Sequence, residues 1–366
     1  MEIRINRDDL FKPLSHVAGV VERRQTLPIL SNILVQSNGT GLQLTGTDLE
    51  IEVVATTNAG AAEGGAVTIP ARKLFDICRA LPGGAELEIK QEGERVVIRS
   101  GRSRFTLLTL PVADFPNVEV GGWDVTFKLP EEALKRLLER TQFCMAHQDV
   151  RYYLNGVLLE LSGARVRAVA TDGHRMGISE FSLGTGQDGD RQAIVPRKGV
   201  LEMVRFLSNA PEEVEARLSN NHAQVRAKDI TLTAKLIDGR FPDYNQVIPA
   251  AYQKIIRVDR GVLREALTRA SILANEKYRG VRFTIQSGNL TITAHNPEQE
   301  EAEEAVPIGY EGEDVEIGFN VNYVIDAING LEGEEVQLAM NDANSSCTLQ
   351  APGKQDTRYV VMPMRL

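Results

Sequence analysis

The chain has little cysteine and no apolar run long enough to span a membrane. Its three cysteines, Cys78, Cys144 and Cys347, lie far apart, which excludes a disulfide framework and a zinc knuckle. The N-terminus MEIRINRDDL lacks the apolar core of a signal peptide, and no stretch reaches the ~18 apolar residues that cross a bilayer. We therefore expect a cytoplasmic protein with buried thiols and no membrane partner.

The sequence does contain a threefold internal repeat. Each copy opens on an amphipathic helix, at NRDDLFKPLSHVAGVV, PEEALKRLLERTQFCM and DRGVLREALTRASILA, and continues into two alternating strands joined by a turn. The polar residues after these strands, Asp48, Asp172 and Asn296, lie 124 residues apart. A second helix and further strands complete each copy.

This pattern predicts an α+β fold of three tandem domains, residues 1–122, 123–253 and 254–366. Each domain should pack two helices, about 12 to 16 residues long, on antiparallel sheets. The composition agrees with a globular chain, since 42% of the residues are hydrophobic and 25% charged, whereas disordered chains have far fewer apolar residues for their charge.

Charge is distributed unevenly over the three copies. The first has 13 basic and 15 acidic side chains, the second 17 of each, and the third 11 basic and 18 acidic. Four arginines fall within ten residues of the first copy, whereas five glutamates crowd residues 298–304 of the third. Each cluster alone is typical of a solvated face. Together they indicate a head-to-tail contact between third and first copies, which closes a ring if the rotation closes.

Basic residues also recur at the ends of the predicted helices, among them Arg24, Arg72 and Lys198. If equivalent helices line one side of a ring, that side would hold a polyanion through phosphate contacts although the formal net charge is −9. The alternative, that these are exposed faces of ordinary amphipathic helices, stays open.

The signatures of catalysis are largely missing. The chain has no Walker A pattern, no Rossmann glycine fingerprint, no nucleophile elbow and no HExxH spacing among its five histidines. We therefore expect no cofactor, no metal and no catalytic residue. The remaining enzymatic alternative is a repeat-built hydrolase with Asp172 and His174 as an acid/base pair. The motifs TDLE and HNPE occupy the equivalent positions without that histidine, which favours Asp172 as a turn-closing residue.

Eleven ordered blocks of the sequence point to one family. They are TLPILSN, LTGTDLE, SGRSRF, AHQDVRYYLNG, ATDGHR, VPRKGV, DGRFPDY, NEKYRGVR, HNPEQEEAEE with IGFNVNYV, and the terminal YVVMPMRL. From the first helix to the last residue the chain resembles the beta subunit of bacterial DNA polymerase III, the replicative sliding clamp. The resemblance implies a non-catalytic homodimer of three-domain crescents that encircles duplex DNA without sequence preference and confers processivity on the replicative polymerase.

The resemblance also implies partners and site residues. The partners are the replicative polymerase subunit, an ATP-dependent clamp loader, and other replication and repair proteins that carry clamp-binding peptides. DNA contacts would fall on Arg24, Arg72, Gln148, Tyr152, Tyr153, Arg197 and Lys198. The tyrosines could stack on bases or merely pack within their hairpin.

Partner peptides would dock in a pocket between the second and third domains. The apolar C-terminus suits such a groove, and the two methionines in it adapt to varied peptides. By resemblance the pocket comprises Leu154, Thr171, Gly173, His174, Arg175, Met176, Pro242, Val247, Asn320, Tyr323, Ser346, Val360, Met362, Pro363, Met364 and Arg365. The chain departs from the family pattern at Gln246, where a basic residue is expected, and at Met176, where leucine is expected.

The dimer contact would have an apolar centre and a charged rim. Phe105, Leu107, Ile272 and Leu273 form the centre, while Lys73, Arg95 and Arg102 face Glu298, Glu300 and Glu304.

A third interpretation is a peptide-binding scaffold with no DNA role. Retention on circular but not on linear DNA would exclude it, because only an encircling ring slides off the ends.

Overall fold

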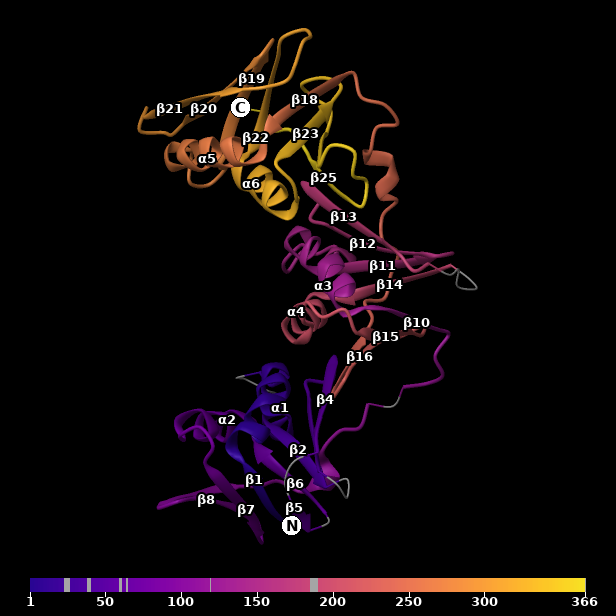
Figure 1. The fold of residues 1–366 in the computed structure, drawn as a ribbon, viewed down its shortest axis with the longest axis vertical. Helices are drawn as coiled ribbons and strands as arrows, with labels where there is room; N and C mark the ends of the chain where they lie inside the picture. Colours follow the sequence, from indigo (N-terminus) through magenta and orange to yellow (C-terminus); the bar gives the residue numbers. More distant parts are fainter. Residues whose placement is uncertain are drawn as a thin grey trace. The chain divides into compact units, whose positions relative to one another are not determined.

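The computed structural model describes residues 1–22, 27–37, 41–58, 61–63, 65–118, 120–184 and 190–365. The chain divides into two compact units, residues 1–135 with 195–237 and residues 136–194 with 238–366. The helix α3 (Glu131–Glu139) and the strand β14 (Arg191–Pro196) run across the division. Figure 1 shows these elements along the chain.

The first unit contains α1, α2, α4 and two antiparallel sheets. A five-stranded sheet has the order β5-β1-β7-β8-β9, and an eight-stranded sheet has the order β10-β15-β16-β17-β4-β3-β2-β6. The bounds are α1 (Arg7–Val20), α2 (Ala71–Ala80), α4 (Arg197–Phe206), β1 (Glu2–Asn6), β2 (Asn32–Ser37), β3 (Leu42–Thr47), β4 (Ile51–Thr57), β5 (Ala61–Glu63), β6 (Ala66–Pro70), β7 (Glu86–Glu92), β8 (Arg95–Ser100), β9 (Ser103–Leu108), β10 (Val125–Pro130), β15 (Glu213–Leu218), β16 (His222–Ala227) and β17 (Ile230–Lys235).

The second unit contains α5, α6 and two more antiparallel sheets. Its eight-stranded sheet has the order β14-β11-β12-β13-β25-β24-β23-β18, and its four-stranded sheet has the order β21-β20-β19-β22. The bounds are α5 (Arg260–Ala270), α6 (Val321–Gly330), β11 (Gly156–Ser162), β12 (Arg165–Thr171), β13 (Arg175–Ser182), β18 (Lys254–Asp259), β19 (Gly280–Gln286), β20 (Asn289–His295), β21 (Glu301–Pro307), β22 (Val315–Asn320), β23 (Glu335–Met340), β24 (Cys347–Gln350) and β25 (Thr357–Val361).

Each eight-stranded sheet takes four strands from one sequence repeat and four from the next. In the first unit the join is β17 against β4, where Ile230 pairs with Ala55 and Ala234 with Ile51. In the second unit β13 pairs with β25 over Arg175–Ser179 and Thr357–Val361. Because both joins are continuous antiparallel ladders, backbone hydrogen bonds tie neighbouring repeats together in each unit.

The helix α1 has 14 residues, within the predicted range, whereas α2 to α6 have 9 to 11 and are shorter than predicted. Hydroxyl side chains explain two of the early ends. Thr141 donates to the carbonyl of Leu137 after α3, and Ser271 donates to the carbonyl of Thr268 at the end of α5. These bonds compete with the helical ladder, and the chain goes on into the short 3-10 turns Gln142–Cys144 and Ser271–Leu273.

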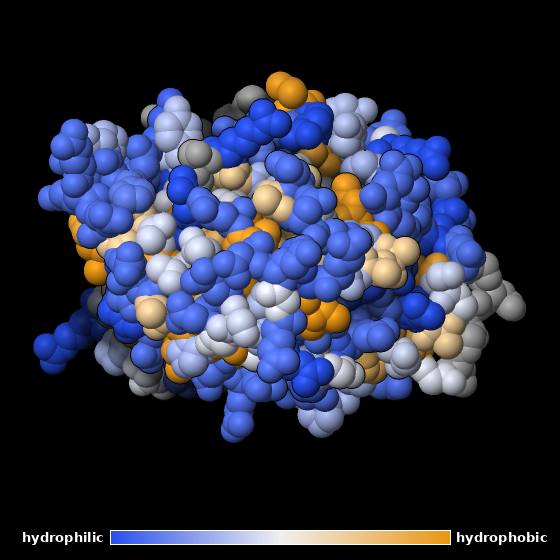
Figure 2. Space-filling view, turned by 90° about the horizontal axis from the view of Figure 1, so that it is seen from above, coloured by the Kyte–Doolittle hydropathy of each residue, from blue (hydrophilic) through white to orange (hydrophobic). Residues whose placement is uncertain are grey.

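Apolar residues of the alternating strands form the core. Phe283 of β19 and Phe319 of β22 are fully buried and meet edge to face, with ring centroids 5.3 Å apart. The three cysteines are free and buried, as predicted. The face drawn in Figure 2 is covered mainly by hydrophilic side chains, with hydrophobic ones in small separate groups. Within the described residues, no helix is long and apolar enough to cross a membrane.

We expect Phe283→Ala to destabilise the second unit by about 3 to 5 kcal/mol, because it leaves a cavity in the four-stranded sheet. Urea unfolding followed by tyrosine fluorescence and circular dichroism should show the fall in midpoint. Tyr278→Ala is the matched control, since 55% of that side chain is exposed, and its midpoint should change little. Equal midpoints for the two variants would contradict the assignment of Phe283 to the core.

Candidate functional site

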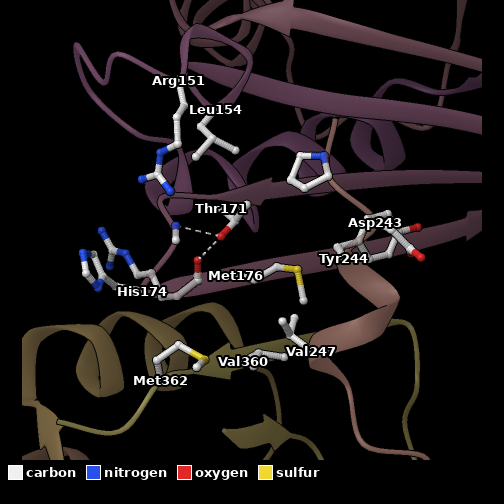
Figure 3. A pocket seen from close by; sticks show the side chains of 13 residues that line it. Arg151, Leu154, Thr171, His174, Met176, Asp243, Tyr244, Val247, Val360 and Met362 are labelled. Atoms are coloured by element: carbon white, nitrogen blue, oxygen red, sulfur yellow. Dashed lines mark hydrogen bonds between the residues drawn. The ribbon is translucent and has the colours of Figure 1, made fainter. Parts of the chain in front are cut away.

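A cavity of about 220 Å³ lies in the second unit, beside the pairing of β13 with β25. Its floor is apolar, since Leu154, Met176 and Val360 are each almost completely buried. Figure 3 shows Val247 and Met362 closing it from two different segments. The lining residues are Arg151, Leu154, Thr171, Gly173, His174, Arg175, Met176, Pro242, Asp243, Tyr244, Val247, Val360 and Met362.

Ten of the sixteen residues predicted for the pocket line this cavity, and six do not. Asn320 caps α6 by accepting from the backbone of Asn322 and Tyr323. Ser346 donates to the carbonyl of Val247, and the amide of Met364 donates to Gly318. The six residues outside the lining are Asn320, Tyr323, Ser346, Pro363, Met364 and Arg365.

The turn between β12 and β13 forms one edge of the cavity. The Asp172 carboxylate accepts hydrogen bonds from the backbone of His174 and Arg175, both at 2.9 Å. Thr171 donates its hydroxyl to the carbonyl of Arg175 and accepts from the amide of Gly173, as the dashed lines in Figure 3 show. The prediction that Asp172 closes a turn is confirmed.

The equivalent residues of the other repeats also accept backbone amides, with the same spacing at Asp48 and a longer one at Asn296. Asp48 accepts from the amides of Glu50 and Ile51, and Asn296 accepts from the amide of Glu300. In the turn of the second repeat Gly173 has φ +89, which glycine adopts without steric cost. Because Asp172 bonds the backbone of His174 and the guanidinium of Arg175, the geometry favours a turn-closing role over an acid/base pair.

Arg175 joins the cavity to α6. Its guanidinium donates to Asp172 at 3.2 Å, to Asp326 of α6 at 2.5 Å and to the carbonyl of Phe143 at 2.6 Å. The ring of Tyr323 lies 4.5 Å below it. Arg175 therefore holds two carboxylates and an aromatic ring in fixed positions at the edge of the cavity.

The sequence did not predict three of the lining residues, Arg151, Asp243 and Tyr244. Arg151 lies between Gln148 and Tyr152, which were assigned to DNA, and its guanidinium donates two hydrogen bonds to Asp149, at 3.0 and 2.9 Å. Tyr244 is 6% exposed although its neighbours in the short 3-10 turn Tyr244–Val247 are exposed. The motif DGRFPDY gives no local sign of this burial, because the hydrogen-bond partners of the buried tyrosine, Arg167 and Glu160, lie on distant strands.

The residues predicted to contact DNA have different environments. Gln148 has φ +54 and is exposed, and Tyr152 meets Tyr153 at 5.8 Å in the 3-10 turn Tyr152–Leu154. In the first unit Arg72 donates to the carbonyl of Val21, and Arg197 is half-buried at the start of α4. Arg24 lies outside the described residues.

Lys198 is held inside an acidic cluster of the first unit. Its ammonium group pairs with Asp48 and with Glu22 and donates to the carbonyl of Val20. These hydrogen bonds and charges raise the pKa of Lys198, although burial, the largest single influence, acts in the opposite direction. The lysine stays charged at neutral pH but already has carboxylate partners.

The residues predicted for the dimer contact are divided between the two units, and five of them belong to the first. Lys73, Arg95 and Arg102 are exposed, and Phe105 and Leu107 are half-buried on the edge strand β9. The sequence did not predict Leu108, which is 67% exposed on the same strand.

In the second unit Ile272 is 75% exposed and Leu273 is half-buried. Glu298 and Glu300 are exposed. Glu304 already accepts two hydrogen bonds from Arg269 of the same chain, at 2.8 and 2.7 Å, so it is less available to a partner than the prediction assumed.

The described side chains offer little for metal chemistry. No group of three or more His, Cys, Asp or Glu residues in the part of the chain that the structure describes is placed to hold a metal ion. The cavity can instead accept apolar groups on its floor and hydrogen bonds at its charged rim.

Comparisons with known proteins agree over the full length. Residues 1–119, 128–243 and 245–365 match the family models for the N-terminal, central and C-terminal domains of the DNA polymerase III beta subunit. The beta sliding clamps of Pseudomonas putida and Escherichia coli K12 are 51% and 49% identical, with 100% of both chains covered.

Solved structures agree as well. A sliding clamp (DNA polymerase III subunit beta) from Pseudomonas aeruginosa, bound to griselimycin, has a TM-score of 0.97 and 49% identity over 100% of each chain. The polymerase III beta structure from Caulobacter crescentus has a TM-score of 0.94 and 36% identity, again over 100% of each chain.

We expect Arg151→Gln to raise the pKa of Asp149. In the native chain the Arg151 side chain, then its backbone amide, lower that pKa to about 2, and without the guanidinium it should rise toward the ordinary value near 4. The native carboxylate keeps its charge until the pH falls toward 2, whereas that of the variant is protonated as the pH falls through about 4. Carboxyl NMR titration measures both values, and an unchanged pKa would contradict the pairing.

Proposed function

The chain belongs to the DNA polymerase III beta subunit family, the bacterial beta sliding clamps, and on that premise we propose which of its surfaces carry out the work of a clamp. As a beta sliding clamp it confers processivity on DNA polymerase III and catalyses no reaction. The observation that carries this function is the ordered match of three domain models along one chain, together with about 50% identity over the full length.

We propose domain boundaries near residues 122 and 253. The gap between the first two matched ranges, 1–119 and 128–243, includes residue 122, whereas the third range, 245–365, begins before residue 253. Each eight-stranded sheet takes four strands from each side of one of the two boundaries. A domain in this sense is one copy of the sequence repeat. Its strands form an eight-stranded sheet together with strands of the neighbouring copy.

We propose that DNA contact is electrostatic and independent of base sequence. Arg24, Arg72, Gln148, Arg197 and Lys198 would meet phosphates, and the exposed ring of Tyr152 would stack. Because Lys198 already pairs with Asp48 and Glu22, a phosphate contact there exchanges one anion for another. Such contacts are weak, which suits a ring that holds DNA by topology and slides along it.

We propose that two chains close the ring head to tail. The contact would join β9 of one chain to the surface around Ile272 and Leu273 of the other. The exposure of Ile272 and Leu108 supports an apolar centre. Arg95 and Arg102 would face Glu298 and Glu300 at the rim, where ion pairs contribute about 0 to 1 kcal/mol each. The apolar centre should therefore decide the stability of the dimer.

Replacing both Ile272 and Leu273 by alanine should give a folded monomer, because truncating a large side chain that is buried on association costs roughly 2 to 5 kcal/mol. Sedimentation at micromolar concentration measures the mass. The same variant should lose retention on nicked circular DNA, which the native ring leaves only after linearisation. Val262→Ala, a half-exposed position on α5, is the control. A double variant that remains dimeric would place the interface elsewhere.

We propose that the cavity of the second unit binds extended peptides of partner proteins. Its apolar floor would take a leucine or aromatic anchor, while Arg151, His174 and Arg175 would hold the peptide backbone at the rim. Griselimycin, which the Pseudomonas aeruginosa clamp binds, is a candidate ligand for the same cavity. Gln246 and Met176, which depart from the family pattern, would shift peptide preference.

Partners that use this cavity would include the replicative polymerase subunit, the ATP-dependent clamp loader, and replication and repair proteins with clamp-binding peptides. A shared peptide pocket makes these partners compete for the clamp. We place this work in the cytoplasm, where bacterial chromosomes are replicated and where the three buried thiols stay reduced.

Deleting residues 362–366 should abolish peptide binding and leave a dimer that still encloses DNA. The deletion removes Met362 from the cavity and takes nothing from the surfaces proposed for DNA or dimer contact. Fluorescence anisotropy with a short labelled Leu-Phe peptide measures binding, and sedimentation measures dimerisation. Ile255→Ala, a half-exposed residue of the edge strand β18, is the control. Undiminished peptide affinity would overturn the pocket assignment.

A further inference from the structure

A row of alternating charges crosses three strands of the sheet that lines the cavity. Glu160 of β11 is the cross-strand partner of Arg167 on β12, and Arg167 is the partner of Glu180 on β13. Arg167 donates to Glu180 at 3.0 Å and lies 3.5 Å from Glu160. Opposite charges placed directly across a ladder stabilise the sheet and fix one another's rotamers.

Tyr244 docks on this row. Its hydroxyl accepts a hydrogen bond from Arg167 at 2.6 Å and donates a short one to Glu160. The other carboxylate oxygen of Glu160 accepts a hydrogen bond from Gln192, at 2.6 Å. Burial, and then the bond to Glu160, raise the pKa of Tyr244 to about 12, so the phenol keeps its proton at neutral pH.

Tyr244 also fixes one wall of the cavity. It opens the turn Tyr244–Val247, and Pro242, Asp243, Tyr244 and Val247 all line the cavity. Figure 3 shows Asp243, Tyr244 and Val247 on one side, facing Met176. The turn itself is held by short-range bonds, from Gln246 to Asp243 and from Ile248 to Asn245. The Tyr244 hydroxyl links this wall directly to the sheet. The hydrogen bond from Ser346 to the Val247 carbonyl also holds the wall.

We propose that Glu160, Arg167 and Tyr244 are positioning residues for the peptide pocket: the charge row sets the place of the 242–247 wall through the tyrosine hydroxyl and so sets peptide affinity. This inference rests on the proposed peptide-binding function of the cavity. None of the three needs to contact the peptide through its polar group, because the Tyr244 hydroxyl acts by holding the 242–247 wall in place.

The test measures binding of the short labelled Leu-Phe peptide to the full-length clamp, well below its melting temperature. Tyr244→Phe keeps the ring and removes the hydroxyl, so the dissociation constant should rise about five- to tenfold. Glu160→Gln should do the same, and the double variant should bind no more weakly than the weaker single variant. Effects that multiply would overturn the shared network.

Arg165→Gln is the matched control. Arg165 pairs with Glu180 at 3.3 Å but is not a hydrogen-bond partner of Tyr244, so its loss should leave the affinity unchanged. A general loss of stability would lower the melting temperature of all variants alike. Displacement of the wall should instead speed amide exchange at Gln246 and Ile248 in Tyr244→Phe while β12 stays protected.

Leu154→Ala separates this inference from the function on which it rests. If Leu154→Ala weakens peptide binding and Tyr244→Phe with Glu160→Gln does not, the positioning role is wrong and the pocket assignment stands. If none of these variants changes the affinity, the cavity is not the peptide site and both proposals fall. Weakening by Leu154→Ala and by both network variants, with Arg165→Gln silent, supports the proposal.

Discussion

The pairing of β13 with β25 is the interaction on which the candidate site depends. Five residue pairs, from Arg175 with Val361 to Ser179 with Thr357, bring the end of the chain against the middle of it. The pairing continues into the bond from the Met362 amide to the His174 carbonyl. Without it Val360 and Met362 would not share a cavity with Met176 and Leu154. The wall at 242–247 then completes the cavity.

Much of the fold could be predicted because each copy of the repeat carries the same local pattern of residues. The interval of 124 residues marks three turns in which Asp48, Asp172 and Asn296 accept backbone amides. The joining of strands from different repeats could not be predicted, because β4 and β17 have the same alternating pattern as any half-buried strand. The predicted lengths of α3 and α5 were too long, because the hydrogen bonds of the Thr141 and Ser271 hydroxyls at their ends leave no periodic signal in the sequence.

The candidate site was predicted in part, and its gaps have physical causes. Resemblance named ten of the thirteen lining residues. It missed Tyr244, whose role depends on Arg167 and Glu160, 77 and 84 positions away in sequence. It assigned Lys198 to DNA and Glu304 to the dimer contact, whereas Asp48 and Arg269 pair with them within the chain. Charge can be counted from sequence, but its pairing depends on the folded neighbours.

The shared sheets determine the order in which the strands can pair while the chain is being synthesised. Strand β4 must wait for β17, and β13 for β25, each partner being about 180 residues downstream. At a translation rate of ~5 to 20 residues per second, each strand edge stays open for about 10 to 35 s on the ribosome. Open edges are templates for pairing with other chains. A nascent clamp therefore passes through two intervals in which it depends on dilution or chaperones, and slowed translation between residues 57 and 230 would prolong the first.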